Sequence, residues 1–160
     1  MKTLIVYKSQ HGTTEKAALY LQERLGNEET DVLELTNGLP ENFNDYENVL
    51  IGGSIHAGSI QRKIKKFCTV YLPELLEKQV GLFMCYMDMA HGEQEFNEAY
   101  PESLRNHAKA TGLFGGEYVF EKMNFIERFI VKKITGQTKS KSSLDYDAMD
   151  AFADTIASDH

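Results

Sequence analysis

A run of hydroxyl, amide and imidazole side chains surrounds a glycine near the start of the chain. It consists of Ser9, Gln10, His11, Gly12, Thr13 and Thr14. An apolar stretch at 4–7 precedes the run, and a stretch with helical spacing at 15–25 follows it. Because the first turn of a helix has free N–H groups and a positive dipole end, this strand, turn and helix predict a phosphate site. No Lys or Arg lies between Lys8 and Lys16, so neutral donors would bind the anion.

Two common nucleotide-binding patterns are absent from this run. It matches neither Gly-x-x-x-x-Gly-Lys-Ser/Thr, which binds nucleoside triphosphates, nor Gly-x-Gly-x-x-Gly, which binds dinucleotides. A plainer alternative also stays open, in which Ser9 or Thr13 is only a helix N-cap beside a turn glycine.

Two later loops contain residues suited to a planar ligand. The first is rich in glycine, which lets the backbone approach a ring closely, and its candidates are Ser54, Ile55, His56, Ala57 and Gly58. The second offers an aromatic ring and a soft thioether, and its candidates are Tyr86, Met87, Asp88 and Ala90. A planar ligand would sit between the two loops. In the alternative interpretation, Tyr86 and Met87 simply cover the end of the core.

Apolar runs that alternate with helical patterns predict an α/β fold with a largely parallel sheet. The predicted strands are 3–7, 31–35, 49–53, 80–85 and 115–120, and the predicted helices are 15–25, 61–71, 91–110 and 146–157. Pro101 must start or interrupt a helix in the third helical stretch. Five strands suit a three-layer sandwich, and such a sheet binds its ligand at the carboxyl ends of the strands.

Composition and charge are those of an ordinary globular protein. The chain has 160 residues, of which 42% are hydrophobic and 26% charged, so we expect a single domain over 1–160. No apolar run approaches the roughly 20 residues that span a bilayer, and no signal-peptide pattern is present, so the expected location is cytoplasmic. Cys68 and Cys85 match neither a metal-binding nor a redox-pair spacing and are expected to be reduced thiols near the core. The sequence suggests no catalytic residue and no metal ligand.

Basic charge is concentrated in residues 121–141. Six basic residues against two acidic ones give this segment a charge of +4, whereas the net charge of −7 leaves −11 for the remainder. Apolar residues share the segment, which makes it a candidate amphipathic helix for an anionic membrane surface. The alternative is a helix whose apolar side packs on the sheet.

These features together resemble the flavodoxin superfamily over almost the whole chain. Ser9, Gly12 and Thr14 fit that family's Thr/Ser-x-Thr-Gly-x-Thr phosphate loop, and His11 replaces its usual small residue. The resemblance implies a five-stranded parallel sheet in the order 2-1-3-4-5 with helices on both faces. It also implies FMN as cofactor, with the phosphate in the 9–14 loop and the ring between the two later loops. Such a protein transfers electrons between a reductase and an acceptor.

Within that superfamily, the chain resembles the branch that contains menaquinone-dependent protoporphyrinogen oxidase. The similarity lies in residues 51–58, followed by a helix, and in residues 125–134. It implies an alternative function as an FMN enzyme of haem biosynthesis that passes electrons to a quinone. The chain has no tryptophan to stack on a flavin, so stacking would fall to Tyr86, Ile55 or His56. A lesser alternative is a flavin-free binding protein on the same fold, and the acidic chain gives no support for nucleic-acid binding.

Overall fold

Five parallel strands form the central sheet of the computed structural model, which describes residues 2–36, 38–118, 122–135 and 141–158. The strands follow the order β2-β1-β3-β5-β6, and they are β1 (Thr3–Tyr7), β2 (Thr30–Glu34), β3 (Asn48–His56), β5 (Gln79–Cys85) and β6 (Ala110–Leu113). In the register, Thr3 pairs with Thr30 on one side and with Asn48 on the other. The predicted order 2-1-3-4-5 is therefore confirmed for the parallel strands.

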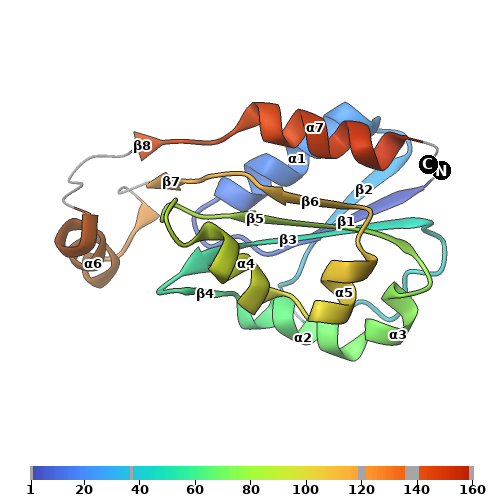
Figure 1. The fold of residues 1–160 in the computed structure, drawn as a ribbon, viewed down its shortest axis with the longest axis horizontal. Helices are drawn as coiled ribbons and strands as arrows, with labels where there is room; N and C mark the ends of the chain where they lie inside the picture. The colour runs from blue at the N-terminus through green and yellow to red at the C-terminus, as the bar shows by residue number, and fades with distance from the viewer. Residues whose placement is uncertain (1, 37, 119–121, 136–140, 159–160) are drawn as a thin grey trace.

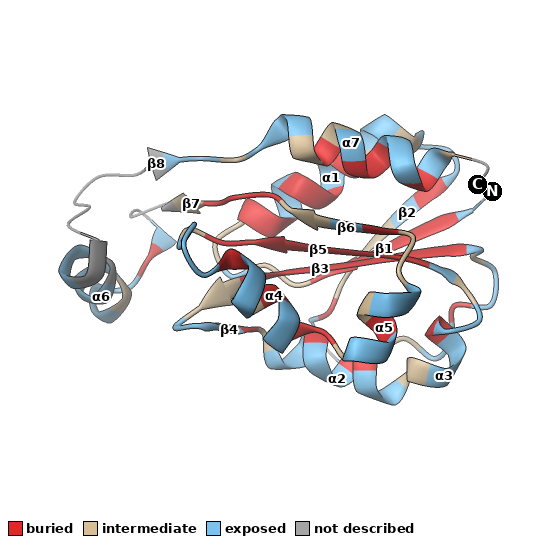
Figure 2. Ribbon diagram, viewed as in Figure 1, coloured by how far each residue is buried: buried red, intermediate tan, exposed pale blue. Residues whose placement is uncertain are grey.

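Helices cover both faces of this sheet (Figure 1). The helix bounds are α1 (Thr13–Leu25), α2 (Arg62–Val70), α3 (Leu72–Leu75), α4 (Gly92–Ala99), α5 (Glu102–His107), α6 (Phe125–Thr135) and α7 (Tyr146–Ala157). Helices α1 and α7 pack on one face, where Leu21 and Phe152 meet Phe83 of β5 in one buried cluster. The helices α2 to α5 lie on the opposite face, over a second buried cluster. Figure 2 shows the three inner strands β1, β3 and β5 as the most deeply buried part of the sheet.

The fifth strand of the sheet is not where the sequence predicted it. We expected it at 115–120, but the sheet uses β6 (Ala110–Leu113), whose first residue ended the predicted helix and whose other residues were assigned to no element. Gly115 has a positive φ of 68°, which breaks the extended backbone after Phe114. The chain then forms β7 (Glu117–Tyr118), which pairs antiparallel with β8 (Lys141–Ser142) in a separate small sheet. The end of the predicted strand, at 119 and 120, lies outside the described residues.

The predicted helix at 91–110 is in fact two short helices, α4 and α5. Pro101 lies between them and forms the N-cap of α5, where the missing N–H of proline costs no helical hydrogen bond. Helix α7 has the predicted bounds, and the carboxylate of Asp145 accepts the N–H of Ala148 at its start. No helix among the described residues is long and apolar enough to cross a membrane.

Helix α6 lies beyond the carboxyl ends of the strands, apart from the layered body (Figure 1). Four of its apolar side chains are exposed, with fractions of 84% for Phe125, 67% for Ile126, 57% for Phe129 and 41% for Ile130. They recur at spacings of four residues and so share one side of the helix. The alternative in which this apolar side packs on the sheet is therefore wrong for these residues.

Candidate functional site

The predicted phosphate loop connects β1 to α1 at the carboxyl edge of the sheet. Gly12 occupies the N-cap position of α1 with a φ of 92°, a conformation that side chains rarely adopt. Its N–H donates to the Ser9 hydroxyl at 2.8 Å, which holds the turn closed. No side chain of the described residues caps the helix, so its first-turn N–H groups face the loop without a side-chain acceptor. Ser9 thus stabilises the turn, and Thr13 is not a cap.

Thr14 supports the suitability of this loop for an anion. Its side chain is fully buried, and its hydroxyl oxygen has no full hydrogen-bond partner among the described residues, although the hydroxyl interacts weakly with the Cys85 thiol. A buried hydroxyl without a partner carries a free-energy cost that a bound phosphate oxygen would remove. The loop, the uncapped helix and this hydroxyl together fit a phosphate group.

A cation also lies against this loop, although the local sequence contains none. The ammonium nitrogen of Lys122 lies 3.1 Å from the position that a Cβ on Gly12 would occupy. Lys122 is distant in sequence and reaches the loop from the segment that leads into α6. The sequence led us to expect neutral donors at this loop, and the structure adds a cation from a distant segment beside them.

Two carboxylates meet the side chains of the loop in this structure. Glu127 of α6 accepts from Gln10 Nε2 at 2.9 Å and lies 2.6 Å from His11 Nε2. Glu117 of β7 accepts from the Thr13 hydroxyl at 3.4 Å and forms an ion pair with Lys16 at 2.9 Å. Both carboxylates occupy donors that a phosphate would otherwise use.

The first of the two loops predicted to hold a planar ligand, residues 54–58, is part of a β-hairpin. Strand β3 continues to His56, turns through Ala57 and Gly58, and returns as β4 (Ser59–Ile60), with His56 paired to Ser59. Both turn residues have positive φ, 51° for Ala57 and 82° for Gly58, as a type I′ turn requires. Ile55 faces Ile60 across this hairpin. The glycine-rich segment, which the sequence predicted as a loop lying close to a ring, is therefore a regular hairpin with a tight turn.

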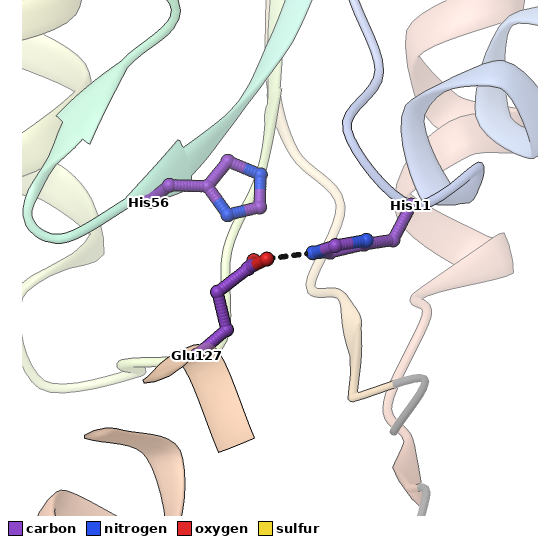
Figure 3. A group of neighbouring side chains, drawn as sticks. All are labelled: His11, His56 and Glu127. Carbon is purple, nitrogen blue, oxygen red and sulfur yellow. Dashed lines mark hydrogen bonds and ion pairs between the residues drawn. The ribbon is translucent and has the colours of Figure 1, made fainter. Parts of the chain in front are cut away.

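A chain of hydrogen bonds fixes the base of the hairpin. The Gln61 side chain accepts the N–H of Ser54 at 2.9 Å and donates to the Ser54 hydroxyl at 2.8 Å. That hydroxyl in turn contacts His56 Nε2 at 2.9 Å. These bonds orient the His56 ring toward the phosphate loop, where its centroid lies 5.7 Å from that of His11 (Figure 3).

Burial and charge set the protonation of this cluster. Burial, and then the neighbouring His11, lower the pKa of His56 to about 4, so its ring is neutral near pH 7. For Glu127, burial raises the pKa, but hydrogen bonds from His11 and the Asn124 backbone outweigh it and leave the pKa below its usual value. Glu127 is thus a carboxylate at neutral pH.

The second loop predicted to hold a planar ligand, residues 86–90, follows β5. Tyr86 is only 7% exposed, and its ring packs against Gly92, where a Cβ would meet it at 2.5 Å. Asp88 pairs with His91 at 2.7 Å, and Ala90 is exposed. Met87 Sδ lies near Gly116, 3.2 Å from where a Cβ would be. An open cavity of about 380 Å³ adjoins Tyr86 and is bounded by Gly115 and the start of α7.

The two cysteines are not suited to a reactive role. Cys68 and Cys85 are free and buried, as the sequence predicted. Burial raises the pKa of each thiol to about 12, so neither is a thiolate at neutral pH.

Comparison with known proteins identifies the family. The family model described as a flavodoxin domain matches residues 4–145. The chain belongs to the flavodoxin domain family. Comparison with curated proteins finds no significant match.

Several solved structures share this flavodoxin fold. A short-chain flavodoxin associated with a non-canonical PDU bacterial microcompartment is 13% identical, with a TM-score of 0.57 over 98% of this chain and 97% of its own. The two-electron reduced flavodoxin of Megasphaera elsdenii is 20% identical, with a TM-score of 0.52 over 69% of this chain and 84% of its own.

A larger protein contains the same fold as one part. Rubredoxin oxygen:oxidoreductase of Desulfovibrio gigas is 16% identical, with a TM-score of 0.55 over 98% of this chain, but the match spans only 37% of that enzyme. At these identities the likeness concerns the fold alone. The protoporphyrinogen oxidase branch receives no support from these comparisons.

Proposed function

We propose that this flavodoxin-domain protein binds FMN non-covalently and transfers electrons through it. The observation that carries the proposal is the uncapped start of α1, where Gly12 in its left-handed conformation lets an anion approach the backbone and the buried Thr14 hydroxyl has no strong hydrogen-bond partner. When bound, the flavin supplies a ring that accepts and releases electrons. The protein supplies the site and the surroundings of that ring.

In this proposal, the loop residues hold the phosphate by dipoles and hydrogen bonds. The first-turn N–H groups of α1 and the hydroxyls of Thr13 and Thr14 donate to phosphate oxygens. The nearby ammonium of Lys122 offsets part of the phosphate charge. Glu127 gives up its bonds to Gln10 and His11 when the phosphate takes its place.

The ring is proposed to lie at the hairpin and the loop after β5. Gln61 holds Ser54 at the base of the hairpin, which fixes one side of the proposed ring site. Residues 86–90 form the other side. Because Tyr86 is buried against Gly92, stacking on the flavin falls to His56 and Ile55 unless the Tyr86 ring moves.

An electron carrier is the form of this function that the site supports best. A carrier needs only a bound ring and no acid or base, and the acidic body of the protein would steer it toward basic redox proteins. A cytoplasmic location stays a prediction.

The second candidate is an oxidase that passes electrons from a porphyrinogen to a quinone, and one observation favours it. Helix α6 exposes four apolar side chains beside exposed Lys132 and Lys133, a combination suited to the headgroup region of an anionic membrane. Contact with a membrane would bring the flavin near a quinone. Oxidation of protoporphyrinogen above the rate of free FMN would establish this activity, and its absence with rapid electron uptake from a flavodoxin reductase would establish the carrier.

A matched pair of glycine variants tests the proposed site. Gly12 and Gly26 flank α1 and both have positive φ, 92° and 104°. Gly12→Val places a side chain in the phosphate loop, whereas Gly26→Val introduces comparable backbone strain at the other end of the helix. We expect Gly12→Val to weaken FMN binding at least about 100-fold, since several phosphate contacts are lost, and Gly26→Val to leave the affinity unchanged. Equal affinities in the two variants would refute the phosphate-loop assignment.

A further inference from the structure

Three side chains with metal-binding atoms meet where the phosphate loop, the hairpin and α6 come together. His11, His56 and Glu127 each offer one ligand atom, and these atoms all lie within 4.8 Å of one another (Figure 3). The residues are partly buried and come from three separate segments of the chain. No spacing in the sequence indicates this group, because 45 and 71 residues separate its members.

The ring of His56 is already oriented for such a role. Its Nε2 contacts the Ser54 hydroxyl at 2.9 Å, and Gln61 in turn holds that hydroxyl. This leaves the other ring nitrogen, and Figure 3 shows a nitrogen of the His56 ring on the side of the Glu127 carboxylate. Metal-binding histidines characteristically use one nitrogen for the metal and the other for a hydrogen bond that fixes the ring.

The geometry points to a binding site for a divalent transition-metal ion held by His11, His56 and Glu127. Two imidazoles and one carboxylate form a ligand set that suits Zn²⁺ or Fe²⁺ and disfavours Mg²⁺ and Ca²⁺, which prefer oxygen ligands. Three protein ligands leave at least one coordination position open to water or to an anion.

Only small movements separate the present arrangement from a bound state. Ligand bonds of about 2.0–2.2 Å in a tetrahedral site place neighbouring ligand atoms about 3.3 Å apart. His11 Nε2 and Glu127 Oε2 are now 2.6 Å apart and would move slightly apart. The two ligand atoms that are furthest apart, at no more than 4.8 Å, would move closer to each other. Neither change exceeds about 1.5 Å.

Such an ion would fasten α6 to the body of the protein. His11 and His56 belong to segments that follow β1 and end β3, whereas Glu127 belongs to α6, which otherwise stands apart from the layers. The ion would therefore join the phosphate loop and the β3–β4 hairpin to α6, the helix with the exposed apolar side.

Zinc titration of the full chain, stripped with a chelator and free of FMN, tests this site. We expect one Zn²⁺ per chain at micromolar or tighter affinity in wild type, with a loss of about tenfold or more in His56→Asn and in Glu127→Gln. His91→Asn is the matched control, since His91 also pairs with a carboxylate, at 2.7 Å from Asp88, but lies outside the group. Circular dichroism confirms that each variant is folded.

Limited trypsin digestion gives a second measurement. Lys132 and Lys133 of α6 are exposed, so we expect Zn²⁺ to slow cleavage there several-fold in wild type and not in Glu127→Gln. Absence of saturable binding in wild type would overturn the proposal and leave His11 and Glu127 as an ion pair. Equal affinity in wild type, His56→Asn and Glu127→Gln would overturn it as well. Because the titration contains no FMN, neither result bears on flavin binding.

Discussion

Nε2 of His11 lies 2.6 Å from Oε2 of Glu127, which joins the phosphate loop to a helix 116 residues further along the chain. Glu127 also accepts from Gln10 at 2.9 Å. A carboxylate of this protein thus contacts two side chains of the loop that is proposed to hold the FMN phosphate. Phosphate and carboxylate both carry negative charge, so each one weakens binding of the other at these donors.

The first prediction concerns that competition. Glu127→Gln removes the negative charge near the loop and should tighten FMN binding about three- to tenfold, corresponding to about 1 kcal/mol. Fluorescence titration in a chelating buffer measures the affinity. Glu98→Gln, an exposed neutralisation on α4, is the control and should have no effect. Weaker binding in Glu127→Gln would mean that the carboxylate supports the flavin site.

The second prediction concerns the two buried thiols. Since burial raises the pKa of Cys68 and of Cys85 to about 12, native protein at about pH 8 should react negligibly with a disulfide reagent. Both thiols should react promptly in denaturant. Because each folded pKa lies above the unfolded value, the contribution to stability is complete below about pH 8.5 and is lost as the pH rises toward 12. Fast labelling of the native protein would contradict this burial.

The third prediction concerns the turn of the hairpin. Ala57 has a φ of 51°, which an L side chain adopts at a cost, so Ala57→Gly should raise the free energy of unfolding by about 1 kcal/mol. Gly58→Ala, at a φ of 82° and with open space around its Cβ position, should lower it by a similar amount. Denaturant unfolding measures both. Changes of the opposite sign would show that the turn differs from type I′.

The fourth prediction concerns the exposed side of α6. The double variant Phe125→Ser and Phe129→Ser should reduce co-sedimentation with anionic vesicles several-fold, because it removes two of the four exposed apolar side chains. Val70→Ser is the control, since Val70 is 50% exposed on α2, away from α6. Vesicle binding that is absent in wild type, or equal in all three proteins, would exclude a membrane role for this helix.

Local patterns in the sequence were sufficient to predict most of the fold. The apolar runs at β1, β3 and β5 and the spacing of α1 and α7 gave elements close to those observed, because each buries a continuous apolar stretch. The fifth strand was misplaced because the apolar run at 115–120 begins with a glycine of positive φ, whereas the short β6 contains Gly112 and lacks a strong strand pattern.

The candidate site was only partly predictable. Residues 9–14 and 54–58 could be found because turns, hydroxyls and glycines are local signals, and the edge of a parallel sheet brings them together. The sequence could not place three further residues at this loop, namely Lys122, Glu117 and Glu127. They lie far from the loop in the sequence, and only the tertiary structure brings their segments to it. The basic, apolar character of 121–141 was the one signal that pointed to this part of the chain.

A side-by-side titration of the protein with FMN and with riboflavin, which lacks the phosphate, tests whether the 9–14 loop binds the phosphate of the flavin. If the 9–14 loop binds phosphate, FMN should bind at one per chain and at least about 100-fold more tightly than riboflavin, a difference of about 2.7 kcal/mol. Equal affinity for the two flavins, or no binding of FMN, would contradict the proposed site.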